Sequence, residues 1–255
     1  EISSLNVELE HRVADRTSEL EAKHREMEAF TYSVSHDLKA PLRGIDGYSR
    51  LLESDHADSL DDEGRFFVAM IRKATGQMGE LIDDLLAYSR VERGRPKLGP
   101  IAPGPVLAAV VDGAAAEAAA GAIALSASVE PALTVLGEHD GLVLALRNLL
   151  DNAIKFTAGR PDRAIEVGVR RALGHALFWV HDNGPGFDMR YHDRIFEIFQ
   201  RLHRAEEFPG TGVGLAIVRK AVERMHGKVW AESAKGEGAT FYIQLPAVDH
   251  KAANL

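Results

Sequence analysis

The chain has 255 residues, of which 45% are hydrophobic and 27% charged, so it can bury a substantial core, and its length favours two domains or one domain with an extension. A formal net charge of −8 and the lack of a basic face in the sequence exclude a general nucleic-acid binder, which needs positive charge for phosphates. The absence of cysteine excludes disulfides, thiolate metal sites and a cysteine nucleophile, and it fits a reducing compartment.

The start of the sequence shows no targeting or membrane signal. No apolar run is long enough to cross a bilayer, and there is no signal peptide. Glu1 already lies inside a helical pattern, without an initiator methionine. We therefore expect a cytoplasmic fragment whose upstream part is absent.

The first 34 residues predict a helix with a coiled-coil seam. No Pro or Gly occurs from Ile2 to Val34, and apolar residues recur at heptad spacing. They are Val13, Leu20, Met27 and Val34, with Leu9 and Phe30 in the complementary position. Arg16 and Lys23 share that complementary position and weaken the seam. Two interpretations stay open: a helix that transmits a conformational signal, or a simple dimerisation handle.

His36 is the candidate nucleophile, within the stretch from Phe30 to Leu42. An imidazole has a pKa near about 6.5, so an exposed His36 keeps a nitrogen lone pair for attack at cellular pH. Asp37 beside it can accept a ring proton, and Pro41 strains or bends a helix one turn further on. A lone His-Asp pair is more often an ordinary helix surface, so its function depends on motifs elsewhere.

The helix through His36 is predicted to run to about Leu52, and after an Asp-rich turn a second helix carries an apolar stripe. The stripe consists of Phe67, Ile71, Ala74, Met78, Leu81, Leu85 and Tyr88. One hairpin cannot bury both helical stripes well, whereas two hairpins related by a twofold axis form a four-helix bundle. We therefore predict a homodimer.

Glycine and proline crowd residues 94–105, which predicts that the helical part ends and a linker follows. Beyond it we expect helices over 106–120, 142–156 and 213–225, and strands over 123–129, 133–136, 165–170, 176–181, 229–233 and 240–245. Helices interleaved with mostly antiparallel strands predict a two-layer α/β sandwich.

Three polar residues share one face of the helix over 142–156, namely Asn148, Asn152 and Lys155. The amide oxygen of Asn152 can give Mg²⁺ a neutral ligand, and Lys155 can hold a phosphate as a point charge. A solvated polar face is the alternative interpretation.

Two glycine-rich stretches suit a nucleotide. In Asp182-Asn-Gly-Pro-Gly186 the glycines let the backbone lie against a flat base, and Asp182 can accept hydrogen bonds from an amino group such as that of adenine. Gly210-Thr-Gly-Val-Gly-Leu215 opens a helix and exposes amide N–H groups to a phosphate. It is neither a Walker A loop nor a dinucleotide fingerprint. Each stretch alone is also typical of an ordinary turn.

A segment that closes over the nucleotide is predicted between these two stretches, from Ile195 to Pro209. Phe196 and Phe199 can anchor it while its polar remainder moves, and Arg201 lies within reach of the terminal phosphate. The two phenylalanines could as easily be plain core.

In this order and spacing the motifs resemble those of a two-component sensor histidine kinase, over residues 25–247. The motifs are Ser35–Leu42, Asn148–Thr157, Asp182–Gly186, the Phe196/Phe199 segment and Gly210–Leu215. The residues around His36 look most like those of the kinases attached to phytochrome or PAS-type sensors.

The resemblance implies that the γ-phosphoryl group of ATP is transferred to a ring nitrogen of His36, with Asp37 as the base. The phosphoryl group would then pass to an aspartate of a separate response-regulator receiver domain, and a sensor domain would lie upstream of this fragment. Family members that also dephosphorylate their regulator often carry Thr or Asn four residues after the histidine. Ala40 stands there, which argues against phosphatase activity by that route.

For ATP, the resemblance implies that Asn152 binds Mg²⁺, with Asn148 and Lys155 near the phosphates, and that Asp182 recognises the adenine amino group. The other implied ATP-binding positions are Gly184, Gly186, Arg201, Gly210, Thr211, Gly212, Val213, Gly214, Leu215 and Thr240.

The implied fold is a helical hairpin that forms a dimeric four-helix bundle, followed by an ATP-binding sandwich of the gyrase/Hsp90/histidine-kinase type. Its parts are a coiled-coil signalling helix (1–29), a dimerisation and histidine phosphotransfer domain (30–94), a linker (95–105), a catalytic ATP-binding domain (106–247) and a tail (248–255). An ATPase of the broader superfamily would leave His36 without a purpose. A degenerate kinase that serves as a dimeric scaffold is disfavoured, because every nucleotide-contacting position that we identify is intact.

Overall fold

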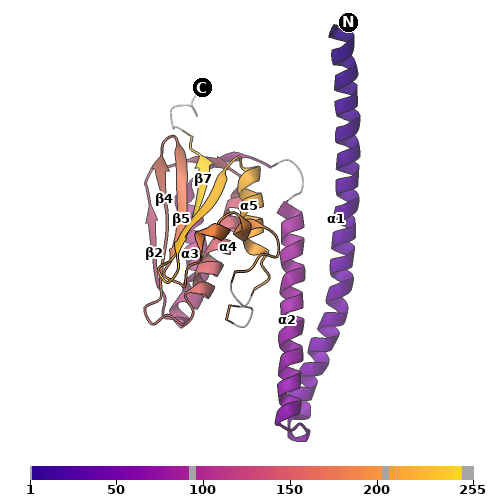
Figure 1. Ribbon diagram of the computed structural model, residues 1–255, viewed down its shortest axis with the longest axis vertical. Helices are drawn as coiled ribbons and strands as arrows, with labels where there is room; N and C mark the ends of the chain where they lie inside the picture. The colour runs from indigo at the N-terminus through magenta and orange to yellow at the C-terminus, as the bar shows by residue number, and fades with distance from the viewer. Residues whose placement is uncertain (1, 92–95, 203–206, 209, 249–255) are drawn as a thin grey trace. The chain divides into compact units, whose positions relative to one another are not determined.

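The computed structural model describes residues 2–91, 96–202, 207–208 and 210–248, and the side chains of residues 2–7, 10, 14, 17, 20, 21 and 24–32 lie outside its described part. The side chains of the predicted seam residues Leu20, Met27 and Phe30 therefore lie outside the described part, and so do the linker residue Gly94 and the tail beyond residue 248. The chain divides into two compact units, Glu1–Ser89 and Arg90–Leu255 (Figure 1).

The first unit is a helical hairpin. Helix α1 (Ile2–Asp55) contains Pro41, and the short helix η1 (Ala57–Ser59) connects it to α2 (Asp62–Val91). Helix α1 is thus continuous through the predicted seam and the phosphoacceptor stretch. Within the described ranges, no helix combines the length and the apolar character that a membrane span requires.

The two helices of the hairpin meet through a narrow apolar contact. Leu42 of α1 packs with Ile82 and Leu86 of α2, and ion pairs join Lys39 to Asp83 and Glu53 to Arg72. Large apolar side chains on both helices stay exposed, among them Leu38, Ile45 and Leu52 on α1 and Phe67, Ile71 and Met78 on α2. In the single chain, the hairpin therefore retains a second apolar face that its own helices do not cover, as the predicted bundle requires.

The second unit is a two-layer α/β sandwich, as predicted. Its sheet has the order β2-β4-β5-β7-β6. The strands are β2 (Ala124–Val129), β4 (Ala164–Ala172), β5 (His175–Asp182), β6 (Lys228–Ala234) and β7 (Gly238–Pro246). Strands β2 and β4 are parallel and the other neighbours are antiparallel. Helices α3 (Pro103–Ala120), α4 (His139–Phe156) and α5 (Gly214–Arg224) cover one face of the sheet (Figure 1).

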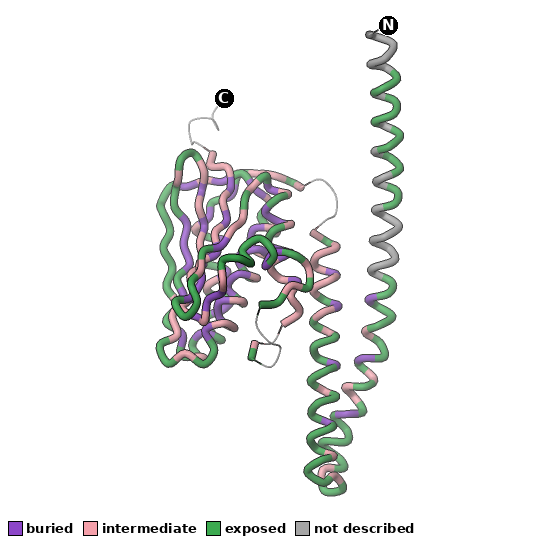
Figure 2. Tube along the Cα trace, viewed as in Figure 1, coloured by how far each residue is buried: buried purple, intermediate pink, exposed green. Residues whose placement is uncertain are grey.

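Strand alternation separates the two faces of this sheet. In β5 every second residue is buried, from Ala176 through Phe178 and Val180 to Asp182. Strand β7 buries Phe241, Ile243 and Leu245 in the same way. The apolar residues among them form one core with apolar residues of the three helices, and Figure 2 shows the buried residues concentrated in the strands and in the helices packed on them.

The predicted linker is wrong in its second half. Gly99–Ile101 forms strand β1, which pairs antiparallel with β3 (Val135–Gly137), and α3 already begins at Pro103. Proline suits the first turn of a helix because its missing N–H would have no intrahelical partner there. Glycine and proline mark a break in the chain correctly, but they do not reveal a pairing with a segment more than thirty residues away.

Candidate functional site

Asp182 is a buried carboxylate at the end of β5. It is 2% exposed and lies between Ile165 of β4 and Ala239 of β7 in the sheet. Its Oδ1 accepts a hydrogen bond from the Gly184 N–H at 2.9 Å. Burial raises the pKa of Asp182 to about 6, and the backbone hydrogen bonds and nearby His181 oppose that rise. The carboxylate therefore has a fixed position and spare acceptor capacity for an amino group.

The turn after Asp182 excludes side chains at two glycines. A Cβ on Gly184 would lie 2.7 Å from the carbonyl oxygen of Phe156, and a Cβ on Gly186 would lie 2.1 Å from that of Ala234. Gly186 also has φ +60°, which L side chains rarely adopt. The turn therefore passes directly against the end of α4 and against the turn between β6 and β7.

The polar face of α4 lies against the second glycine-rich loop. A Cβ on Gly214 would lie 2.8 Å from Oδ1 of Asn148 and 4.0 Å from Nδ2 of Asn152, and a Cβ on Gly210 would lie 3.0 Å from Nζ of Lys155. Lys155 donates a hydrogen bond to Oδ1 of Asn152 at 3.1 Å. The three residues predicted to share a face do so, and the fold brings them to the predicted phosphate cradle.

The backbone of this cradle needs glycine. Gly210 has φ +148° and Gly212 φ +76°, in regions that favour glycine. The Thr211 hydroxyl accepts a hydrogen bond from the Val213 N–H at 3.3 Å. Helix α5 begins at Gly214, so its first N–H groups lack intrahelical acceptors and can bind an anion. Leu215 packs against the core instead.

The two predicted anchors of the closing segment differ. Phe196 is 6% exposed and packs edge-on against Phe241, with ring centroids 6.4 Å apart. Phe199 is 56% exposed and has φ +63°, so the prediction that its ring anchors the segment is wrong. Its backbone N–H instead donates to the Gly212 carbonyl at 3.0 Å, which ties the segment directly to the cradle.

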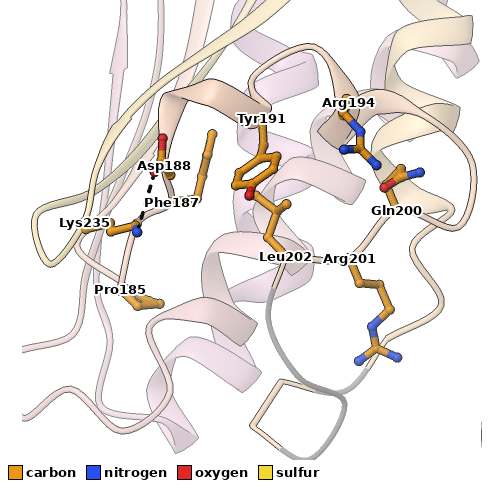
Figure 3. Close-up of a pocket in the computed structure, with 10 residues that line it drawn as sticks. Pro185, Phe187, Asp188, Tyr191, Arg194, Gln200, Arg201, Leu202 and Lys235 are labelled. Carbon is orange, nitrogen blue, oxygen red and sulfur yellow. Dashed lines mark ion pairs between the residues drawn. The ribbon is translucent and has the colours of Figure 1, made fainter.

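Arg201 lies beside a cavity of about 490 Å³, a volume typical of small-molecule sites (Figure 3). The cavity is lined by Pro185, Gly186, Phe187, Asp188, Tyr191, Arg194, Gln200, Arg201, Leu202 and Lys235. The Arg201 guanidinium donates to the Phe208 carbonyl at 2.8 Å. Residues 203–206 and Pro209 of the predicted closing segment lie outside the described residues.

Thr240 does not join these residues. Its hydroxyl lies 2.9 Å from Nδ1 of His181. Side chains alternate along a strand, so His181 and Thr240 lie on the face of the sheet opposite to buried Asp182. Ala239 is the β7 residue that pairs with Asp182. The prediction of Thr240 as a residue near the base is therefore wrong, because the strand register places its hydroxyl on the other face.

The phosphoacceptor pair lies in the hairpin unit. His36 is well exposed on α1, and its Nδ1 lies 3.3 Å from Oδ1 of Asp37. When Nδ1 carries the ring proton it donates to that carboxylate, and Nε2 keeps its lone pair in solvent. This arrangement suits attack by Nε2 on an electrophile.

Ser233 is a site-supporting residue that no motif indicated. Its hydroxyl accepts from the Phe187 N–H at 2.8 Å and donates to the Gly238 carbonyl at 2.7 Å. It thereby links the turn after Asp182 to both β6 and β7. Tyr191 and Lys235 line the cavity and were also not predicted. Like Ser233, they lie near residues that are distant in sequence, and only the folded chain brings them together.

The turn after Asp182, the glycine cradle beside Lys155 and the exposed His-Asp pair of the hairpin together suit a protein of the phosphotransfer class. Residues 26–94 match the family model of the His Kinase A (phospho-acceptor) domain, and residues 137–249 match that of the Histidine kinase-, DNA gyrase B-, and HSP90-like ATPase. The chain belongs to the sensor histidine kinases, and the predicted family is confirmed.

Similar proteins include phytochromes, as predicted. The chain is 37% identical over 236 residues to cyanobacterial phytochrome A of Nostoc sp.. The aligned region covers 92% of this chain and 30% of the phytochrome. It is also 37% identical to the methanogenesis regulatory histidine kinase FilI of Methanothrix harundinacea, over 91% of this chain and 26% of that protein. The chain thus spans less than a third of the length of these relatives.

Solved structures agree with the fold. Full-length ShkA in complex with AMPPNP matches with a TM-score of 0.64 and 29% sequence identity. The superposed region covers 86% of this chain and 45% of the ShkA chain. The mycobacterial sensor histidine kinase MprB has a TM-score of 0.51 and 28% identity, over 59% of this chain and 97% of its own.

Proposed function

We propose that this chain is the catalytic region of a sensor kinase that transfers the γ-phosphoryl group of ATP to His36 and then passes it to an aspartate of a response-regulator receiver domain. The observation that carries the proposal is the convergence of Asp182, the polar face of α4 and the glycine cradle in one unit. That convergence provides a base-recognition end and a phosphate end for one nucleotide.

Binding of ATP follows from these groups. The Asp182 carboxylate accepts a hydrogen bond from the adenine amino group, and the absence of a Cβ at Gly184 and Gly186 leaves room for close backbone packing. Lys155 and the N–H groups at the start of α5 supply positive charge for the phosphates. Arg201, at the cavity, adds a further cation on the side of the closing segment.

A magnesium ion fits the donor set beside Lys155. Mg²⁺ in nucleotide sites takes one or two protein oxygens, with phosphates and waters completing its octahedron. The amide oxygen of Asn152 already faces a cation, the Lys155 ammonium at 3.1 Å. Asn152 would hold the ion, which when bound neutralises charge on the phosphate oxygens.

The chemical step needs alignment more than covalent assistance. Asp37 holds the proton of the His36 ring at Nδ1, so that the Nε2 lone pair forms the new N–P bond. The bond between the γ-phosphorus and its bridging oxygen breaks, and its electron pair leaves with ADP. In the second step the N–P bond breaks, and a carboxylate oxygen of the receiver aspartate takes the phosphoryl group.

The exposed apolar face of the hairpin supports a homodimer in which two hairpins form a four-helix bundle. The receiver domain would dock on that bundle, where His36 is exposed. We place the reaction in the cytoplasm, in keeping with a chain that lacks cysteine. Ala40, four residues after His36, has no polar side-chain group that could orient a water for phosphatase chemistry.

Incubation with γ-labelled ATP and Mg²⁺ tests the proposal. We expect acid-labile, base-stable label on the wild-type chain and none on His36→Gln. ATP hydrolysis without such a label would point to a plain ATPase, and nucleotide binding without turnover would point to a scaffold. Either outcome would overturn the proposal.

A further inference from the structure

Arg163 lies outside every motif, yet its guanidinium joins three backbone and side-chain groups. Nη1 donates to the Gly121 carbonyl at 2.9 Å and Nη2 to the Ile154 carbonyl at 2.8 Å, while Nε donates to the Thr157 hydroxyl at 3.3 Å. These acceptors lie at the C-terminal ends of α3 and α4, where carbonyls lack intrahelical partners. The rigid fork of one arginine therefore caps both helices at once.

The backbone around Arg163 is held by the residue that follows Asp182. Asn183 donates from Nδ2 to the Asp162 carbonyl at 2.5 Å and accepts at Oδ1 from the Ala164 N–H at 3.0 Å. Its own N–H donates to the Ala164 carbonyl at 3.3 Å. The residues on both sides of Arg163 are thus tied to the adenine turn.

The last turn of α4, which Arg163 holds, carries the phosphate end of the site. Lys155 in that turn faces Gly210 of the cradle, and the Phe156 carbonyl at the end of the same turn lies against Gly184 of the adenine turn. Thr157, which accepts from Arg163, is completely buried. The adenine end has independent support, because Asp182 is paired within the sheet on both sides.

We infer that Arg163 is a positioning residue for phosphate binding, which holds Lys155 at the cradle through the last turn of α4. The inference rests on the proposed function, since it assumes that the cradle binds phosphates. Loss of the Arg163 guanidinium leaves Asp182 in position, but it removes the hydrogen bonds that hold the last turn of α4 and with it Lys155. The affinity for ADP therefore depends on Arg163, and the affinity for adenosine does not.

Arg163→Lys in the full chain tests this, because lysine keeps the charge but cannot bond three separated acceptors. We expect the dissociation constant of Mg-ADP to rise about tenfold, as is common when a supporting partner is removed, and that of adenosine to change less than about twofold. Arg170→Lys, at an exposed position of the same strand region, is the matched control. Unfolding midpoints show that the variants are folded.

Gly121→Ala provides a second route that leaves Arg163 itself unchanged. Gly121 has φ −85°, which alanine tolerates, but its Cβ would lie 2.5 Å from Nη1 of Arg163 and displace the guanidinium. We expect the same selective loss of Mg-ADP affinity. In the Arg163→Lys background Gly121→Ala should cause no further loss, because both changes break one link.

Four outcomes separate the inference from the proposed function. Failure of the wild-type chain to bind Mg-ADP overturns the proposed function, and the inference with it. Wild-type binding with unchanged Mg-ADP affinity in Arg163→Lys overturns the inference alone. Equal losses for adenosine and Mg-ADP indicate a merely structural role and also overturn it. A selective loss of Mg-ADP affinity in both single variants supports it.

Discussion

At the scale of one residue, burial of the Asp182 carboxylate, the proposed adenine-binding group, lowers the stability of the folded state. Burial raises its pKa to about 6 from an ordinary value of 3.8, so the folded state holds the proton more tightly than the unfolded chain does. The destabilisation by the buried carboxylate is therefore fully present above about pH 6, and it disappears as the pH falls through about 4.

We predict that the free energy of unfolding contains a contribution from Asp182 that rises by about 2 kcal/mol from pH 7 to pH 4. Denaturant titrations of the wild type and of Asp182→Asn measure it. The asparagine variant should lack this contribution, and it should lose adenine nucleotide affinity at pH 7. Parallel pH profiles in the two proteins would contradict the assignment.

Asn152 makes a second prediction at this scale. Asn152→Ala removes the amide oxygen that would bind Mg²⁺, so we expect His36 labelling by Mg-ATP to fall below detection while the dimer stays intact. Asp140→Ala, at a fully exposed position of the same helix, is the control and should label normally. Unchanged labelling of Asn152→Ala would exclude it as the magnesium ligand.

At the scale of elements, the hairpin helix α2 carries more apolar surface than its own partner covers. Its buried residues are Val68, Thr75, Ile82 and Leu86. Three members of the predicted stripe, Phe67, Ile71 and Met78, remain 45–53% exposed in the single chain. A second hairpin could cover this face, since a four-helix bundle buries two faces of each helix.

We therefore predict that Ile71→Glu combined with Met78→Glu converts the dimer to a monomer at micromolar concentration. A charge at a buried interface position costs several kcal/mol unless it is paired. Sedimentation equilibrium measures the mass, with Lys73→Glu on the same helix as the control at an exposed position. A double variant that retains the dimer mass would show that this face is not the interface.

The elements also show where prediction from sequence succeeds. Each long helix and each strand of the five-stranded sheet was expected within a few residues of its observed bounds, because hydrophobic periodicity is a local property. Strand β1, with three residues, was missed because its only signal is the pairing with β3. Thr240 was misplaced because one position along β7 moves a side chain to the other face.

At the scale of the whole molecule, the proposed nucleophile and the proposed nucleotide site belong to different compact units. Chemistry and binding should therefore be separable by substitution. Substitution of a hairpin residue that acts on the imidazole should leave nucleotide affinity unchanged, whereas substitution of a cradle residue should lower it.

Asp37→Asn tests this separation. The amide cannot hold the Nδ1 proton as a carboxylate does, so we expect the rate of His36 labelling to fall by about 100-fold, within the usual range for loss of acid–base assistance. The dissociation constant of the nucleotide should stay within about twofold of the wild-type value. Rapid-quench labelling and calorimetry measure the two quantities, and equal losses in both would remove Asp37 from the base role.

The sequence alone determined the family and the two kinds of unit and predicted most residues of the candidate site, because five motifs in one order carry their residue types and spacing with them. Only the tertiary structure decided which of these residues meet. It brought Asn148, Asn152 and Lys155 to the Gly210–Gly214 cradle, turned Thr240 away, exposed Phe199 and placed Arg163 across two helix ends. Strand register and contacts between distant segments depend on the packing of the whole unit, and no local pattern of residues contains them.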